Sequence, residues 1–348
     1  ALDRIDTLGN KIENNRTISA TGKFDLVKLY NKVPYLKKIN SPPRRSPSRR
    51  PSARQTNPAD SAQVPQKDHK FLKGFTRLLM SVRSVNASYS IREGTSVSGF
   101  SKSPYLLGMD TTWSAPGVDF LLGSQDPGIR QRAAENGWLV DNPVLSDPFK
   151  QLRTVDFTLK STIEPFKDFK IQVDVKKNKT GIYSEIFRTD TLGQYGSYNP
   201  NRSGSYNISF IAIKTAFIVD SPDDVSELFE NFINYRSIIS DRLSQSTGNS
   251  FDKNQQDVLI PSFIAAYTRG DPETQAITAF PRTPLPNWRL DYSGLGKIPA
   301  LRDKFSSFTI THAYSSSYTV SNYANSLLYN NPDGLLLKND IENYNPSS

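Results

Sequence analysis

Apolar and polar residues alternate along several stretches of the chain. In residues 154–164 and 169–176 nearly every second position is apolar, and the positions between them are Thr, Asp, Lys, Gln or Glu. This two-residue period predicts β-strands with one apolar and one polar face. Only residues 165–168 separate the two stretches, so we expect them to form a β-hairpin.

The rest of the chain carries similar but less regular signals. The same period predicts strands at 85–92 and 314–321, and weaker ones at 206–213, 288–293 and 305–311. Helical spacing predicts short helices at 24–30, at 71–80 and between Asp126 and Gly137, and a longer one at 222–243. Pro34 should end the first of these, and Ser221 with Pro222 should start the last. The sequence therefore predicts a fold dominated by β-structure with short helical insertions.

Alternation alone does not say which way the strands face. In a soluble sandwich Val155, Phe157 and Leu159 would point into a core, whereas in a membrane barrel they would point into lipid. A lysine on the lipid side costs about 2–4 kcal/mol near the membrane midplane, so the lysines of these strands should face water in either case. The eleven residues of 154–164 match the roughly 9–11 of a membrane strand. The alternating pattern is compatible with both a soluble sandwich and a membrane barrel.

Composition excludes several classes of protein. The 348 residues include no Cys, which excludes a disulfide scaffold, a thiolate metal site and a thiol nucleophile. The longest apolar run is five residues, 263–267, far short of the roughly 18 that a helical membrane span needs. There are 43 Lys and Arg against 34 Asp and Glu, giving a net charge of +9.

Much of this positive charge lies in residues 41–70. That segment holds five Arg, two Lys and six Pro against Asp60 and Asp68, a net charge of +5. Its only large aliphatic residue is Val64, so we expect a disordered insertion. Paired arginines also suggest nucleic-acid binding. The segment lacks the stacking aromatic residues of such sites, and no nucleic-acid partner is predicted.

We find no signature of catalysis. There is no phosphate-binding loop, no G-x-S-x-G motif and no H-E-x-x-H motif. The two histidines, His69 and His312, are too far apart in sequence to form a local ligand pair. The chain is therefore expected not to be an enzyme and to need no metal or cofactor.

Segments along most of the chain resemble one family. The sequence is similar to the SprA (Sov) family, the outer-membrane translocons of the type IX secretion system and gliding-motility proteins of Bacteroidetes. The most distinctive stretch is RAAENGWL at 132–139. Other matching stretches are LYNKVP at 29–34, FTRLLMSVRSV at 75–85, FLLGSQD at 120–126, EPFKD at 164–168, IPSFIAAY at 260–267, PNWRL at 286–290 and THAYSSSY at 311–318.

The resemblance implies a segment of a very large transmembrane antiparallel β-barrel, of the about 36-stranded size that is the largest known. It implies a pore for folded cargo in the cell outer membrane. Implied partners are a PorV-type barrel protein, a plug protein, membrane lipids and secreted cargo with a C-terminal secretion domain. Because 348 residues cannot close such a barrel, we expect an internal fragment that is completed by the remainder of the same SprA-like polypeptide.

This interpretation divides the chain and assigns its faces. Residues 1–40 are expected to be a short helix and loop segment, 41–70 the disordered insertion, and 71–348 barrel strands with helical insertions. Predicted lipid-facing residues are Val155, Phe157, Leu159, Phe169, Ile171, Val173 and Val175. Predicted lumen-facing residues are Asp156, Lys160, Glu164 and Lys170. The alternative is a soluble or surface-attached β-rich module that binds glycans or proteins.

Overall fold

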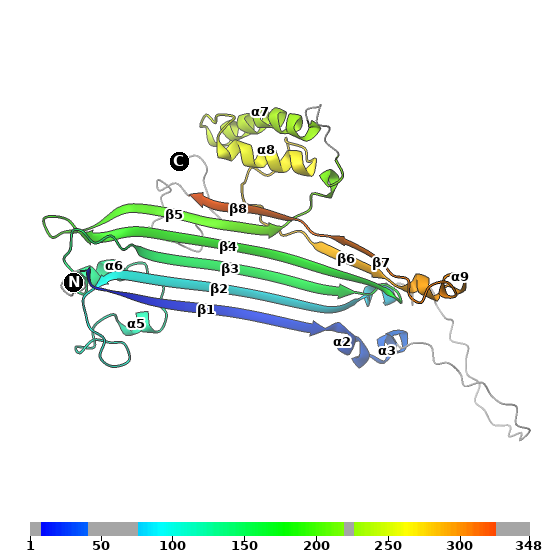
Figure 1. The fold of residues 1–348 in the computed structure, drawn as a ribbon, viewed down its shortest axis with the longest axis horizontal. Coiled ribbons are helices and arrows are strands. Elements are labelled where there is room, and N and C mark those ends of the chain that lie inside the picture. Colours follow the sequence, from blue (N-terminus) through cyan, green and yellow to red (C-terminus); the bar gives the residue numbers. More distant parts are fainter. Residues whose placement is uncertain (1–7, 41–75, 219–225, 325–348) are drawn as a thin grey trace, which may run out of the picture.

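The computed structural model describes residues 8–40, 76–218 and 226–324, and its main element is one antiparallel sheet of long strands (Figure 1). Six strands follow one another across this sheet in the order β1-β2-β3-β4-β5-β8. Their bounds are β1 Asn10–Asp25, β2 Val82–Phe100, β3 Phe149–Ile163, β4 Phe169–Thr189, β5 Tyr195–Ser209 and β8 Ser317–Ala324. The sheet is open, with β1 along one edge and β8 along the other.

Two shorter strands complete the second edge. β6 (Asn287–Tyr292) pairs with the first residues of β4, and β7 (Ile310–Tyr314) pairs with β6. β5 pairs with the later residues of β4, from Lys177 onward. β5 and β6 therefore occupy two successive parts of the same edge of β4, and the chain between them leaves the sheet to form a helical insertion (Figure 1).

The predicted hairpin at 154–176 is confirmed. β3 and β4 pair without a register shift from Phe149 opposite Glu185 to Ile163 opposite Ile171. Both strands are longer than the alternating pattern, because β3 begins at Phe149 and β4 continues to Thr189. Every second residue of β4 is apolar up to Val175, but Lys177 and Lys179 occupy the next two positions of that series. The alternation of apolar and polar residues therefore ends before the strand does.

The prediction of a short helix and loop segment at residues 1–40 is wrong for about half of the described residues, 8–40. Residues Asn10–Asp25 form β1, a sixteen-residue edge strand paired with β2. Helix α2 (Leu26–Lys32) follows, and the Asp25 side chain accepts a hydrogen bond from the backbone N–H of Lys28. Val33 is extended, as expected for a residue before proline. Pro34 then starts a second helix, α3 (Pro34–Asn40), and does not simply end the first.

The other strand predictions are right in place but imprecise in extent. The stretch at 85–92 lies inside β2, and 288–293 matches β6. The stretch at 206–213 is the end of β5, which stops at Ser209. The single strand predicted at 314–321 is divided between β7 and β8, and the strand predicted from 305 begins only at Ile310.

The helices belong to two insertions. α5 (Val118–Leu121) and α6 (Ile129–Glu135) lie between β2 and β3, where α6 confirms the short helix predicted before Gly137. α7 (Glu227–Thr247) and α8 (Gln256–Thr268) form a hairpin between β5 and β6. Smaller elements are η1 (Ile213–Thr215), η2 (Gly294–Lys297) and α9 (Pro299–Arg302).

Three predicted features fall wholly or partly outside the described residues. The insertion at 41–70 and the helix start at Ser221 lie outside them, and the described helix α7 begins at Glu227 and ends four residues after the predicted position 243. Of the helix predicted at 71–80, the described part contains one turn, 76–79. None of the described helices is long and apolar enough to cross a membrane.

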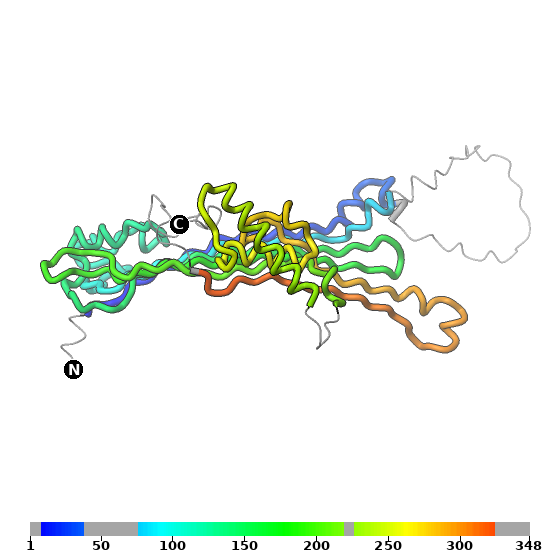
Figure 2. The backbone as a smooth tube through the Cα atoms, turned by 90° about the horizontal axis from the view of Figure 1, so that it is seen from above, coloured from blue at the N-terminus to red at the C-terminus, as the bar shows by residue number. Residues whose placement is uncertain are grey.

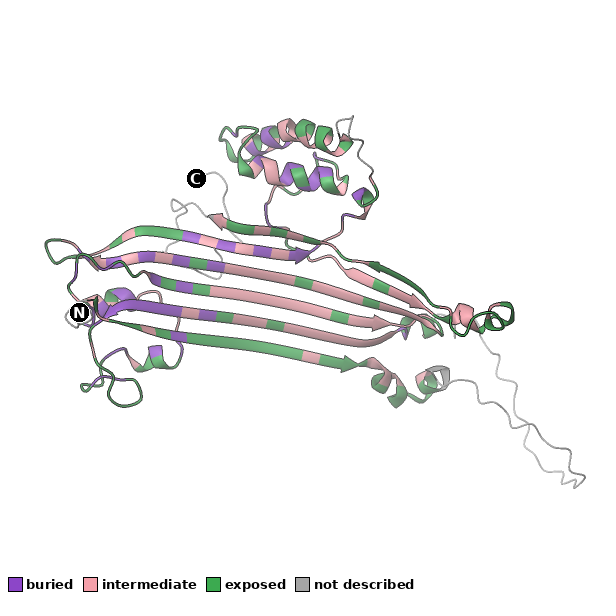
Figure 3. Ribbon diagram, in the orientation of Figure 1, coloured by how far each residue is buried: buried purple, intermediate pink, exposed green. Residues whose placement is uncertain are grey.

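Buried residues gather in a few places and not along the whole sheet. One cluster joins the end of β2 and the start of β3 to α5 and α6 and includes Phe100, Phe120, Trp138 and Phe149. A second joins β5 to residues 279–280, and a third holds α7 and α8 together. Elsewhere most strand residues are intermediate or exposed (Figure 3). Seen from above, the sheet is one thin, elongated layer (Figure 2).

Candidate functional site

The strand registers divide the side chains of the sheet between two faces. In an antiparallel pair, residues directly opposite each other point to the same face, and successive residues point to opposite faces. Leu159 is opposite Val175 and Ala87, and Phe157 is opposite Tyr89. We call the face with these residues the apolar face, and the face with Thr158, Lys160 and Asp174 the polar face.

All seven predicted lipid-facing residues lie on the apolar face. Val155, Phe157 and Leu159 project from β3, and their register partners place Ile171, Val173 and Val175 of β4 on the same side. Phe169 follows by the two-residue period and stands opposite Tyr292 of β6. Whether this face meets lipid remains a prediction, but the structure does bring the seven residues together in one surface.

The apolar surface continues over neighbouring strands and forms a band across six of them. None of its side chains is among the buried core residues, and Ile18, Phe24, Tyr89 and Ile310 are 42–58% exposed. We define the apolar band by the following residues: Ile18, Ala20, Phe24, Val85, Ala87, Tyr89, Ile91, Val155, Phe157, Leu159, Ile163, Phe169, Ile171, Val173, Val175, Trp288, Leu290, Tyr292, Ile310 and Tyr314. Contiguous exposed apolar surface of this extent marks an interaction surface with protein or membrane.

Three of the four predicted lumen-facing residues lie on the polar face. Asp156 accepts a hydrogen bond from the Asn178 side chain, Lys160 stands opposite Asp174, and Lys170 stands opposite Asp291. Thr154 and Thr180 hydrogen-bond across the same two strands at 3.2 Å. The polar face is therefore a surface of hydroxyl, amide and charged groups, matched across neighbouring strands.

The fourth, Glu164, lies just beyond β3. It pairs with Arg83 at 3.1 Å and lines a cleft of about 620 Å³ beside the β3–β4 turn. Lys170 and Asp291 line the same cleft, which places it on the polar side of the sheet. The structure thus brings Glu164 and Lys170 together, although Glu164 is not on a strand.

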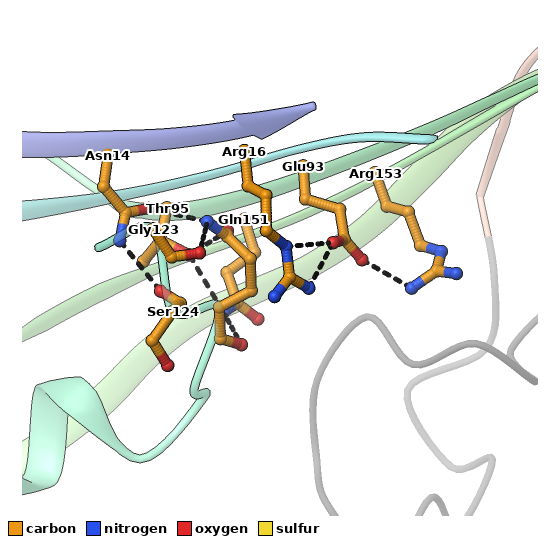
Figure 4. Close-up of polar contacts among 9 residues, drawn as sticks. Asn14, Arg16, Glu93, Thr95, Gly123, Ser124, Gln151 and Arg153 are labelled. Atoms are coloured by element: carbon orange, nitrogen blue, oxygen red, sulfur yellow. Dashed lines mark hydrogen bonds and ion pairs between the residues drawn. The ribbon is translucent and has the colours of Figure 1, made fainter. Parts of the chain in front are cut away.

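The apolar band ends at a row of charged residues (Figure 4). Arg16, Glu93 and Arg153 stand side by side on β1, β2 and β3, one register row beyond Ile18, Ile91 and Val155. Glu93 accepts hydrogen bonds from Arg16 Nη2 at 2.6 Å and Arg153 Nη1 at 2.6 Å. We refer to these three residues as the charged triad.

A network of amides and hydroxyls lies beyond the triad. Gln125 Nε2 donates to Asn14 Oδ1 at 2.7 Å, and Thr95 Oγ1 donates to Gln125 Oε1 at 2.7 Å. Asn14 Nδ2 also donates to the carbonyl oxygens of Phe120 and Ser124. This network ties the loop after α5 to the sheet (Figure 4). The core around α6 follows it along the strands.

Another part of the apolar face is covered by the chain that follows α8. Ala279 and Phe280 pack on Tyr206 and Ile208 of β5, and the Tyr206 hydroxyl donates to the carbonyl of Pro281. Lys177 lies on this face and donates to the carbonyl oxygen of Arg282 at 2.8 Å. The band therefore ends at Val175 on β4 but continues to Val155 on β3. Because Val175 stands opposite Leu159, the band is four residues longer on β3 in this direction.

Within the described residues, no group of three or more His, Asp or Glu side chains is placed to hold a metal ion. His312 is exposed on β7, opposite Leu290, and His69 lies outside the described residues. No family model and no curated protein matches the chain.

Neither the charged triad nor β1 was predicted from the sequence. Arg16 to Phe24 does alternate, but its apolar positions include Ala20 and Gly22, which signal a strand only weakly. Glu93 is 77 residues from Arg16 and 60 residues from Arg153 in the sequence, and pairing of β1, β2 and β3 brings the three side chains together. The polar positions Thr17, Ser19 and Thr21 were the available signal for β1.

Proposed function

We propose that this chain forms a section of the wall of a very large outer-membrane β-barrel, the protein-conducting translocon of the type IX secretion system, which also supports gliding motility. The observation that carries the proposal is the apolar band, which crosses six strands and lies opposite a polar face. Membrane barrels alternate in this way, with apolar residues toward lipid and polar residues toward a watery lumen.

The dimensions of the band support this proposal. On β3 it runs from Val155 to Ile163, a distance of about 26 Å at about 3.3 Å per residue. At a strand tilt of about 40°, that length covers about 20 Å of membrane height, close to the apolar belt of known barrels. The stagger between β3 and β4 at the end of the band is also expected of tilted strands.

The proposed mechanism is passive. The polar face lines a conduit for folded cargo, with Asp156, Lys160, Glu164 and Lys170 on its inner side. The remainder of the same polypeptide supplies further strands beside β1 and β8, because an open sheet edge in lipid leaves backbone groups unpaired. A PorV-type barrel protein, a plug protein, membrane lipids and cargo with a C-terminal secretion domain are the proposed partners.

Single cysteines test this proposal cleanly because the chain contains none. Phe157→Cys and Thr158→Cys place a thiol on adjacent residues of β3 that point to opposite faces. In alkali-washed outer membranes, a lipid-soluble probe should label position 157 and a water-soluble maleimide should label position 158. The reverse pattern contradicts the assignment of the faces. Release of the chain by alkali contradicts the barrel and favours the surface-attached binding module.

A further inference from the structure

The charged triad lies at the boundary between the apolar band and the polar network. Arg16, Glu93 and Arg153 share one register row, and Ile18, Ile91 and Val155 share the next row on the same face. Two residues along a strand span about 7 Å. The guanidinium groups are therefore about the length of one lipid headgroup from the first apolar side chains. Long cationic side chains commonly occupy this position at a membrane interface.

The triad carries one uncompensated positive charge. Glu93 is 9% exposed and is the single carboxylate between two guanidinium groups, at 2.6 Å from each. Its bonds use Arg16 Nε and Nη2 and Arg153 Nη1. Within the described residues, Arg16 Nη1 and Arg153 Nη2 have no hydrogen-bond partner, and the two side chains are 42% and 22% exposed. Oriented, accessible guanidinium donors favour phosphate oxygens.

The arginines are held in position before any ligand binds. Glu93 is fixed on β2 between β1 and β3, and its two ion pairs orient both guanidinium groups to the same side of the sheet (Figure 4). Gly123 in the loop after α5 lies against the Arg16 side chain. Such preorganisation lowers the entropy lost when a ligand binds.

We propose that Arg16 and Arg153 bind the phosphate group of a membrane lipid whose acyl chains lie on Ile91, Val155 and Phe157. This inference rests on the proposed function, because it needs the apolar band to face lipid. Glu93 is a positioning residue that directs both guanidinium groups and does not itself contact the phosphate.

The test uses the intact polypeptide in detergent, with phosphatidylglycerol as the probe and bound lipid counted by native mass spectrometry. Arg16→Gln, Glu93→Gln and Arg153→Gln are combined so that no buried charge loses its partner. We expect the triple variant to bind the lipid at least about tenfold more weakly, because the loss of a single hydrogen bond to a charged group already has about this effect. Arg92→Gln is the matched control, because Arg92 is exposed on the polar face next to Glu93 and should leave binding unchanged.

Arg16→Gln alone provides a second measurement in case the triple variant does not fold, because Glu93 keeps its ion pair with Arg153. It removes one phosphate donor and should weaken lipid binding, whereas unchanged binding overturns the proposal. Wild-type affinity in the triple variant, or an equal loss in Arg92→Gln, also overturns it. Inorganic phosphate should displace the lipid poorly, and full displacement at equal concentration assigns the site to free phosphate instead.

The proposed function is tested separately by recovery of the chain in alkali-washed membranes. A chain that leaves these membranes contradicts the barrel itself. A chain that stays embedded but shows unchanged lipid affinity in the triple variant contradicts only the lipid site.

Discussion

Leu159 of β3 lies directly opposite Val175 of β4, and neither side chain belongs to any of the three buried clusters of the described residues. In a sandwich, a second layer would cover such a pair. Here the pair lies in the middle of the apolar band, and the described insertions pack at the end of β2 and on β5 instead. The environment of this pair therefore decides between a membrane wall and an interface with protein.

An arginine at Leu159 should distinguish lipid from water. In a barrel embedded in lipid, Leu159→Arg should lower the free energy of unfolding by about 2–4 kcal/mol, because the charge must leave water near the membrane midplane. Thr158→Arg, on the polar face, should change it by less than about 0.5 kcal/mol. Urea unfolding in lipid vesicles measures both variants, and equal small effects would mean that the apolar face meets water.

The buried ion pair of the α6 core should be sensitive to the loss of one partner. Arg130 pairs with Glu185, whose side chain is fully buried and also accepts a hydrogen bond from the Tyr183 hydroxyl at 2.6 Å. Glu185→Ala should cost about 3–5 kcal/mol of stability, because Arg130 is left buried without its partner.

A half-exposed pair supplies the control for that substitution. Glu164→Ala removes the pair with Arg83, whose side chains are 42% and 27% exposed, and it should cost about 0–1 kcal/mol. Denaturant unfolding followed by Trp138 fluorescence compares the two variants. Similar losses of stability in the two variants would contradict the burial of the Arg130–Glu185 pair.

The turn at 110–115 should loosen in acid. Hydrogen bonds from Thr112 Oγ1 and from the backbone N–H groups of Ala115 and Ser114 hold the pKa of Asp110 at about 2. Because this pKa is lowered in the folded state, its contribution to stability is complete above about pH 4 and disappears as the pH falls toward 2. Amide exchange at Ser114 and Ala115 should accelerate over this range.

Asp110→Asn checks the cause of that change. The amide keeps an acceptor oxygen but does not gain a proton between pH 4 and 2. Exchange at Ser114 and Ala115 should then be faster at neutral pH and should not vary between pH 4 and 2 beyond the intrinsic rates. A variant that keeps the wild-type pH profile would assign the transition to another group.

The α7–α8 hairpin should depend on its small core. Ile239 is fully buried with Leu243, Phe251 and Val258. Ile239→Ala should destabilise the hairpin by about 2–5 kcal/mol through lost contacts and the cavity left behind. Ile233→Ala on the same helix, where the side chain is 40% exposed, should cost less than about 1 kcal/mol. Proteolysis rates within 226–268 report the difference, and equal rates would contradict the packing of α7 on α8.

Local pattern was enough to predict the central hairpin and the division of its residues between two faces. The alternation at 154–164 and 169–176 fixes which side chains share a face, because the side-chain period of a strand is two. The connection 165–168 is too short for anything but antiparallel pairing. The short helix before Gly137 was also predicted, since its start signal, Asp126 with Pro127, and its end signal, Gly137, flank it closely in the sequence.

Strand length and strand number were decided by the tertiary structure. In β1, Ala20 and Gly22 stand at positions where large apolar residues would have indicated a strand. β1 is nevertheless a strand because fifteen of its residues pair with β2. β4 continues past Val175 because β3 and β5 pair with it on both sides, although Lys177 and Lys179 break its apolar period. Pairing with neighbours supplies backbone hydrogen bonds that do not depend on side-chain pattern.

The sequence by itself determined an antiparallel β-protein with one apolar face, because that information is local and repeats every two residues. Only the tertiary structure aligned Arg16, Glu93 and Arg153 in one row and left the apolar band without a buried core. Those relationships depend on register between strands that are far apart in the chain. A shift of one residue would move each side chain to the other face, so no single stretch of sequence could have specified them.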